Sequence, residues 1–152
     1  MLFRSFLAIL VGGSVAGLLD IIFAISFAAY NGATPARLLQ TVASGLFGKA
    51  AFDGGASMAA FGFALHFAMS VAWADIFYLF ARRVPLLVRQ PVLWGAVFGV
   101  IVFLIMRLIV LPLSAFPYPL KFPPIGTTLD VLSHAFLFGF PIAWCMRKAV
   151  QG

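Results

Sequence analysis

Four long runs of apolar residues occupy most of the chain, at residues 6–28, 57–80, 92–113 and 127–146. Each run is close to the roughly 20 residues that an α-helix needs to cross the hydrocarbon core of a bilayer. Polar residues inside the runs are few and isolated. The pattern predicts an all-α fold: a single integral membrane domain, polytopic, in which four transmembrane helices form a bundle.

A shorter helix is predicted in the first outer loop, at residues 35–47. Thr34 followed by Pro35 is typical of a helix start, and Gly48 of a helix stop. Apolar and polar residues separate onto two faces, with Leu38, Leu39, Val42 and Leu46 on one and Arg37, Gln40, Thr41 and Ser44 on the other. This pattern predicts either an interfacial helix or a lid over the bundle, docked through its apolar face.

The composition excludes an ordinary soluble domain. Of 152 residues, 64% are hydrophobic and 9% are charged, against roughly 45–50% and 25% in soluble domains. The formal net charge of +6 does not indicate nucleic-acid binding, because the basic residues lie between the apolar runs and not on one water-exposed face. The lipid bilayer is therefore the expected partner.

Basic residues are divided unequally between the two sides of the predicted membrane. Six lie on the side of the N-terminus (Arg4, Arg82, Arg83, Arg89, Arg147 and Lys148) and three on the other (Arg37, Lys49 and Lys121). Loops on the cytoplasmic side carry the excess of Lys and Arg. The sequence thus predicts a multi-pass protein of the bacterial inner (plasma) membrane, with its N-terminus and C-terminus in the cytoplasm.

Polar residues from all four runs fall at a similar depth. Asp20, His66, Arg107 and His134 lie six to nine residues inside the predicted outer boundary, which is roughly 9–14 Å at the helical rise. Ionisable side chains in hydrocarbon normally face the interior of the helix bundle, pair with one another and mark a site. We therefore expect a substrate-binding site or proton relay in the outer half of the membrane.

Two pairings are predicted within that layer. Arg107 is the one basic residue deep inside a run, so its guanidinium is the expected partner of the Asp20 carboxylate, either as a site or as a structural contact. Alternatively, its long side chain reaches outward to the membrane boundary, which is about two helical turns away. Asp130 follows Thr127 with the spacing of a capping box, and it also lies one turn before His134. Ser133 is expected on a different helix face from His134.

His66 and His134 could instead act as the two axial ligands of a b-type haem, since imidazole is a common iron ligand. Gly62 and Gly139 would leave space for a flat ring. No haem or zinc spacing motif accompanies the two histidines. The same residues could serve in a proton relay.

Its size, its four spans and the histidine in its second span resemble those of small uncharacterised inner-membrane proteins of Gram-negative bacteria. That resemblance implies a four-helix membrane fold and no particular activity. The leading interpretation is a protein that binds or moves a small polar solute, a proton or a lipid headgroup. Self-association along the glycines of the first and third spans, at Gly13, Gly17, Gly95 and Gly99, would support transport.

Two alternatives remain at this point: a haem-binding electron-transfer protein, and a non-catalytic accessory subunit of a membrane complex. An enzyme is the least supported class, and no catalytic residue is predicted, because no serine or cysteine has a base at a recognisable spacing.

The orientation can be tested by cysteine labelling in spheroplasts. Cys145, the single cysteine of the chain, should react with a membrane-permeant maleimide and not with an impermeant one. In a Lys121→Cys variant, the new cysteine should react with the impermeant reagent. The opposite labelling of the two positions would place the termini outside.

Overall fold

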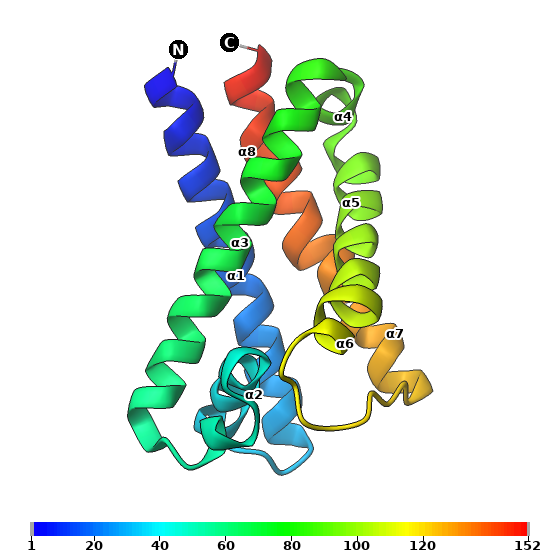
Figure 1. The fold of residues 1–152 in the computed structure, drawn as a ribbon. Coiled ribbons are helices and arrows are strands. Elements are labelled where there is room, and N and C mark those ends of the chain that lie inside the picture. The colour runs from blue at the N-terminus through cyan, green and yellow to red at the C-terminus, as the bar shows by residue number, and fades with distance from the viewer. Residues whose placement is uncertain (1, 152) are drawn as a thin grey trace.

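The computed structural model describes residues 2–151, which consist of helices and connecting loops without a β-strand (Figure 1). The elements are α1 (Leu2–Tyr30), α2 (Pro35–Phe47), η1 (Gly48–Phe52), α3 (Gly55–Arg83), α4 (Leu86–Arg89), α5 (Pro91–Ile105), η2 (Met106–Val110), α6 (Leu111–Leu113), α7 (Pro124–Ser133), η3 (His134–Gly139) and α8 (Phe140–Gln151).

Four helical stretches are long and apolar enough to span a membrane: Phe3–Tyr30, Gly55–Arg83, Pro91–Leu113 and Pro124–Val150. The predicted all-α class is therefore confirmed, as are four helices long and apolar enough to span a membrane. The helices extend a few residues beyond the predicted apolar runs, because a helix can continue through polar flanks such as Arg82 and Arg83.

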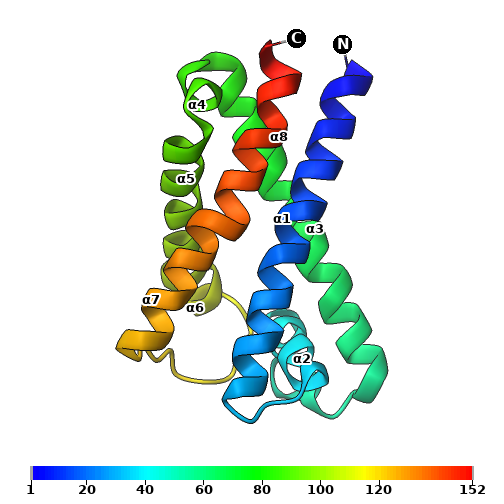
Figure 2. The same cartoon turned by 180° about the vertical axis from the view of Figure 1, so that it is seen from behind.

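Both ends of the described chain lie at the same end of the molecule as α4, and we call this the terminal end (Figures 1 and 2). The opposite end, the loop end, carries α2 and the extended loop of residues 114–123. Helix α1 contacts α3 and α8, and α5 contacts η3 and α8. Helix α2 packs mainly on α3.

Helix α2 has the predicted start and stop. The Thr34 hydroxyl accepts a hydrogen bond from the backbone N–H of Arg37 at 3.2 Å, and Gly48 ends the helix with a φ of 58°. A positive φ costs glycine little, since it has no Cβ. The existence of this helix is thus confirmed, while its position in a membrane interface remains a prediction.

Helix α2 docks through a face that includes small and polar residues, while Leu38, Leu39 and Val42 are half-buried. Gln40, Ala43 and Ser44 are buried against the rest of the chain, whereas Leu46 is 59% exposed. Gln40 donates a hydrogen bond from Nε2 to the carbonyl of Gly55 at 3.0 Å. Small and polar side chains permit a closer helix approach on this face.

The glycines proposed for self-association are used inside the chain. A Cβ at Gly13 would lie 2.6 Å from the backbone of Val71, and one at Gly95 would lie 2.7 Å from that of Phe140. A Cβ at Gly99 would overlap the carbonyl of His134. These glycines bring α1 against α3, and α5 against η3 and α8, while self-association of the chain stays a prediction.

Two spanning helices contain a π-helical turn. In η2 and η3 the backbone hydrogen bonds join residues five apart instead of four. The N–H of Leu111 donates to the carbonyl of Met106, and the N–H of Phe140 donates to that of Ala135. Each turn is followed closely by a proline, Pro112 or Pro141. Proline has no N–H and its ring displaces the carbonyl four residues earlier, which accounts for the wider preceding turn.

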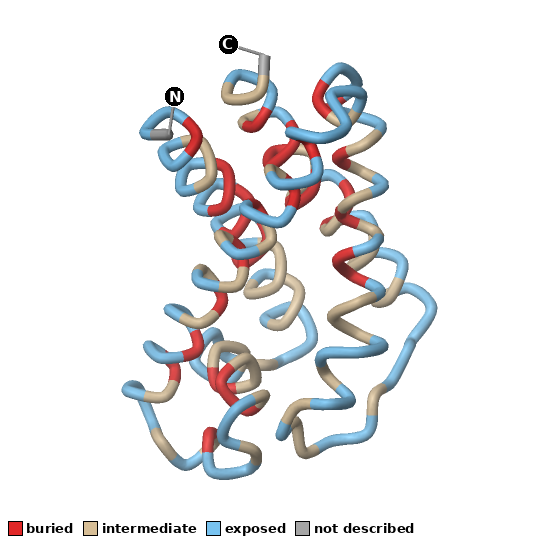
Figure 3. The backbone as a smooth tube through the Cα atoms, turned by 45° about the horizontal axis from the view of Figure 1, so that its top comes forward, coloured by how far each residue is buried: buried red, intermediate tan, exposed pale blue. Residues whose placement is uncertain are grey.

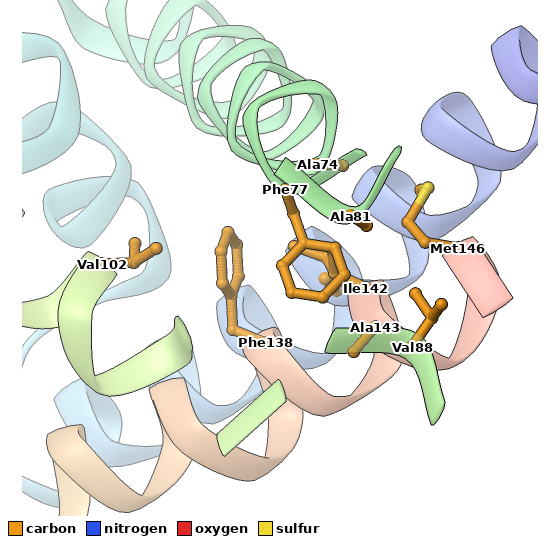
Figure 4. Packing of buried hydrophobic residues seen from close by; sticks show 10 residues of the cluster. Ala74, Phe77, Ala81, Val88, Val102, Phe138, Ile142, Ala143 and Met146 are labelled. Carbon is orange, nitrogen blue, oxygen red and sulfur yellow. The ribbon is translucent and has the colours of Figure 1, made fainter. Parts of the chain in front are cut away.

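The apolar core is built from residues of α1, α3, α4, α5, η3 and α8 and extends toward the terminal end. Its buried members are Ala16, Ala74, Phe77, Ala81, Val88, Val102, Phe138, Ile142, Ala143 and Met146, and those labelled in Figure 4 point toward one another. Figure 3 shows that buried positions recur at intervals along helices that are otherwise intermediate or exposed.

Gly62 provides a test of how α2 docks. A Cβ there would overlap the backbone carbonyl of Leu39, and overpacking of this kind typically costs about 1–3 kcal/mol. Gly62→Ala should therefore lower the thermal unfolding midpoint in detergent. Gly126→Ala, where the new Cβ would meet no atom closer than 3.4 Å, is the control. Equal midpoints for the two variants would contradict the close approach.

Candidate functional site

Three of the predicted polar residues line one small cavity between the helices. Asp20 of α1, His66 of α3 and His134 of η3 all reach it. The cavity measures about 60 Å³, and its other lining residues are Met69, Ser70, Trp73, Val102, Met106 and Phe138. The structure thus brings together side chains that lie far apart in the sequence.

His134 lies between two carboxylates. Its Nδ1 is 3.2 Å from Oδ1 of Asp130 and 3.8 Å from Oδ1 of Asp20. The same nitrogen lies 2.9 Å from the backbone carbonyl of Asp130, to which it can donate a hydrogen bond. With the Nδ1 proton directed at these oxygens, Nε2 of the neutral ring carries the lone pair that can accept a further proton.

The imidazole of His66 is also held by a backbone carbonyl. Its Nε2 lies 2.9 Å from the carbonyl of Gly17, one turn from Asp20 on α1, and donates to it. Ser70 donates in turn to the carbonyl of His66 at 3.0 Å. A Cβ on Gly17 would lie 2.7 Å from the Ser70 hydroxyl oxygen, so glycine allows α1 to approach this part of α3.

Asp130 does not cap a helix. Helix α7 begins at Pro124, and the backbone N–H of Thr127 already bonds the carbonyl of Pro123 at 2.8 Å. Asp130 therefore lies within the helix, and the predicted capping box is wrong. Its predicted second role is confirmed, because its carboxylate contacts His134 one turn later.

Ser133 belongs to the site, although the sequence led us to place it on another face. Its hydroxyl donates to the carbonyl of Asp130 at 3.0 Å and lies 3.5 Å from Oδ1 of Asp20. Asp130, Ser133 and His134 have i, i+3 and i+4 spacing, which puts all three on one helix face. That spacing was the signal that could have identified Ser133.

Arg107 is not the partner of Asp20. Its Nη2 donates to the backbone carbonyl of Lys121 at 2.9 Å, and its guanidinium carbon lies 5.3 Å from the ring centre of Phe122. The predicted ion pair is therefore corrected: Arg107 turns toward the loop end and holds the loop of residues 114–123. The long side chain reaches out of the apolar segment instead of pairing within it.

The residues present do not fit a haem. Nε2 of His66 is engaged by the Gly17 carbonyl, and the cavity shared by the two histidines is about 60 Å³. Pockets for ligands of drug size measure roughly 300–1,000 Å³, and a porphyrin needs a space of that order. Within the described residues, no group of three or more His, Cys, Asp or Glu side chains is placed to hold a metal ion.

Exposure decreases stepwise from Asp130 into the site. The side chains of Asp130, His134 and Asp20 are 34%, 17% and 12% exposed, respectively. Asp130 is the closest of the three to the start of α7 at the loop end. The cluster is therefore open toward the loop end, while the apolar core lies on its other side.

Comparisons with protein-family models, with curated proteins and with solved structures give no match to this chain.

Proposed function

We propose that this chain is a multi-pass protein of a bacterial inner membrane that binds protons reversibly at Asp20, His134 and Asp130. Its four spanning helices form a bundle, both termini lie in the cytoplasm, and the loop end faces the periplasm. The orientation is supported by the six basic residues at the terminal end against three near the loop end.

The observation that carries this proposal is the size of the cavity in relation to the groups around it. The cavity of about 60 Å³ has room for water, because roughly 10–15 Å³ on this measure holds one water molecule. It is much smaller than the roughly 300–1,000 Å³ of pockets for drug-sized ligands. Among the ligands considered from the sequence, the proton is the one that this space accommodates without rearrangement.

A metal cation is less well matched by the same groups. Hard cations are bound by several oxygen ligands at once, whereas here the carboxylates of Asp20 and Asp130 both face an imidazole nitrogen. Two carboxylates and one imidazole within 4 Å can hold one proton or two, and each proton changes the net charge of the group. An imidazolium between two carboxylates has its charge compensated within the cluster.

A relay from the loop end accounts for the order of the groups. Asp130, the most exposed, would exchange protons with the solvent. When Nε2 of His134 takes up a proton, the Nδ1 proton that faces both carboxylates can pass to Asp20 or Asp130. Water in the cavity would have Asp20, His66, Ser70 and His134 as polar partners. The apolar core closes the terminal side, so passage across the membrane would require the helices to rearrange.

Infrared spectroscopy can test this proposal. Difference spectra of purified protein between low and high pH should contain the carbonyl stretch of a protonated carboxyl group, and Asp20→Asn should reduce it. His134→Gln should shift the midpoint of this band by roughly one pH unit or more, since a charged neighbour is removed.

Asp75→Asn is the matched control, because Asp75 is an exposed carboxylate outside the cavity. This variant should retain both the band that depends on Asp20 and its midpoint. A band that is unchanged in amplitude and midpoint by Asp20→Asn and His134→Gln would rule out the proposed site.

A second candidate function, an accessory subunit in a membrane complex, is favoured by Asp75 itself. This carboxylate is exposed on α3, eight residues before Arg83 and so roughly 12 Å along the helix from it. Among the described residues no ion pair involves Asp75. It follows a stripe of exposed alanines at every fourth position, Ala60, Ala64, Ala68 and Ala72.

A polar group on a face of small residues is typical of helix contacts within membranes. If a partner helix covers this face, protein extracted in mild detergent should migrate as a larger assembly that Asp75→Leu dissociates. Asp20→Asn should leave the assembly intact. Wild-type protein that is monomeric both in vesicles and after extraction would remove this candidate.

A further inference from the structure

We propose that a groove between α1 and α8 at the terminal end binds an anionic phospholipid, with the headgroup phosphate between Arg4 and Lys148. The groove has a volume of about 450 Å³ and is lined by Arg4, Leu7, Ala8, Val11, Trp144, Cys145, Lys148 and Ala149. The groove shares no lining residue with the cavity at His134. Its residues belong to the start of α1 and the end of α8, whereas α7, which contains Asp130, lies toward the opposite end of the molecule (Figure 2).

The charges of the groove are complementary to an anion. Arg4 projects from α1 and Lys148 from α8, and both residues are exposed. No acidic residue is among the lining residues, and no ion pair within the described chain involves either cation. Two like charges on the walls of one groove repel each other, so an anion seated between them would be stabilised by both.

The rest of the groove matches an acyl chain. Leu7, Ala8 and Val11 continue from Arg4 along α1 toward the middle of the helix, over roughly 10 Å at the helical rise. Trp144 lies one turn before Lys148 on α8 and is 49% exposed. Tryptophan and basic residues favour the region of lipid headgroups, with apolar residues deeper in the membrane.

The position of the groove also favours a lipid over a soluble anion. Basic pockets between membrane helices bind anionic headgroups on the side that carries the excess of positive charge. The terminal end is that side of this chain, because Arg82, Arg83 and Arg89 belong to it as well. A diacyl phospholipid supplies both the anion and the apolar chains that this groove accommodates.

Cys145 provides a direct measurement, since it lines the groove and is the single cysteine of the chain. Purified full-length protein in a neutral detergent is treated with a permeant maleimide while phosphatidylglycerol is titrated in. At about ten times the dissociation constant, the alkylation rate should fall roughly tenfold. Phosphatidylcholine with the same acyl chains should protect much less.

Paired variants distinguish lipid binding in this groove from a general effect of positive charge at the terminal end. Arg4→Gln with Lys148→Gln should weaken protection by phosphatidylglycerol about tenfold to thirtyfold, because each basic residue near an anionic lipid contributes roughly fivefold. Arg83→Gln with Arg89→Gln removes the same charge from the same end and should keep the wild-type response. Arg4→Lys with Lys148→Arg, which retains both charges, should also keep most of it.

Two further probes identify the source of the phosphate. Inorganic phosphate and glycerol 3-phosphate should give little protection, because neither one fills the apolar part of the groove. Full protection by either soluble anion would overturn the assignment to a lipid. Equal protection by phosphatidylcholine, or equal loss in both double glutamine variants, would overturn the role of Arg4 and Lys148.

Discussion

The structure is governed by one constraint: polar groups within apolar helices must find their partners inside the chain. A bilayer core supplies no hydrogen bonds, so an unsatisfied group there costs several kcal/mol. Backbone carbonyls provide many of the partners in this protein. The Gly17 carbonyl accepts from His66 and the Asp130 carbonyl from His134, while the Lys121 carbonyl accepts from Arg107.

The same constraint explains the irregular turns. Pro112 and Pro141 each remove one donor from a spanning helix, and in each case the preceding turn widens to bonds between residues five apart. One of these turns begins at His134 and the other contains Arg107. Such π-helical turns often occur at functional sites. In this protein, the turn η3 places the imidazole of His134 within 4 Å of the carboxylates of Asp20 and Asp130.

Close packing divides the molecule into two halves with different properties. The Gly99 backbone touches the turn at His134, and Gly17 admits the Ser70 side chain, so the helices approach closely around a small polar cavity. Toward the terminal end, Phe77, Ile142 and Met146 fill the space between the helices. A site that is polar, small and closed on one side is suited to binding protons and not to conducting larger solutes.

The sequence by itself determined the class of the fold, the four spanning helices and the limits of α2, because these depend on local patterns of hydrophobicity and on capping residues. It also identified Asp20, His66 and His134 as residues of one polar layer, since isolated polar groups stand out in apolar runs.

The sequence could not determine which groups the polar side chains contact. Arg107 was expected to bind Asp20 on charge alone, but its long side chain reaches the loop of residues 114–123 instead. The rotation of α2 was also left open, and close contact at Gly62 buries Gln40, Ala43 and Ser44. Pairing and docking are decided by the rotation and separation of helices, which depend on side-chain shapes brought together from distant parts of the chain and are therefore set only by the tertiary structure.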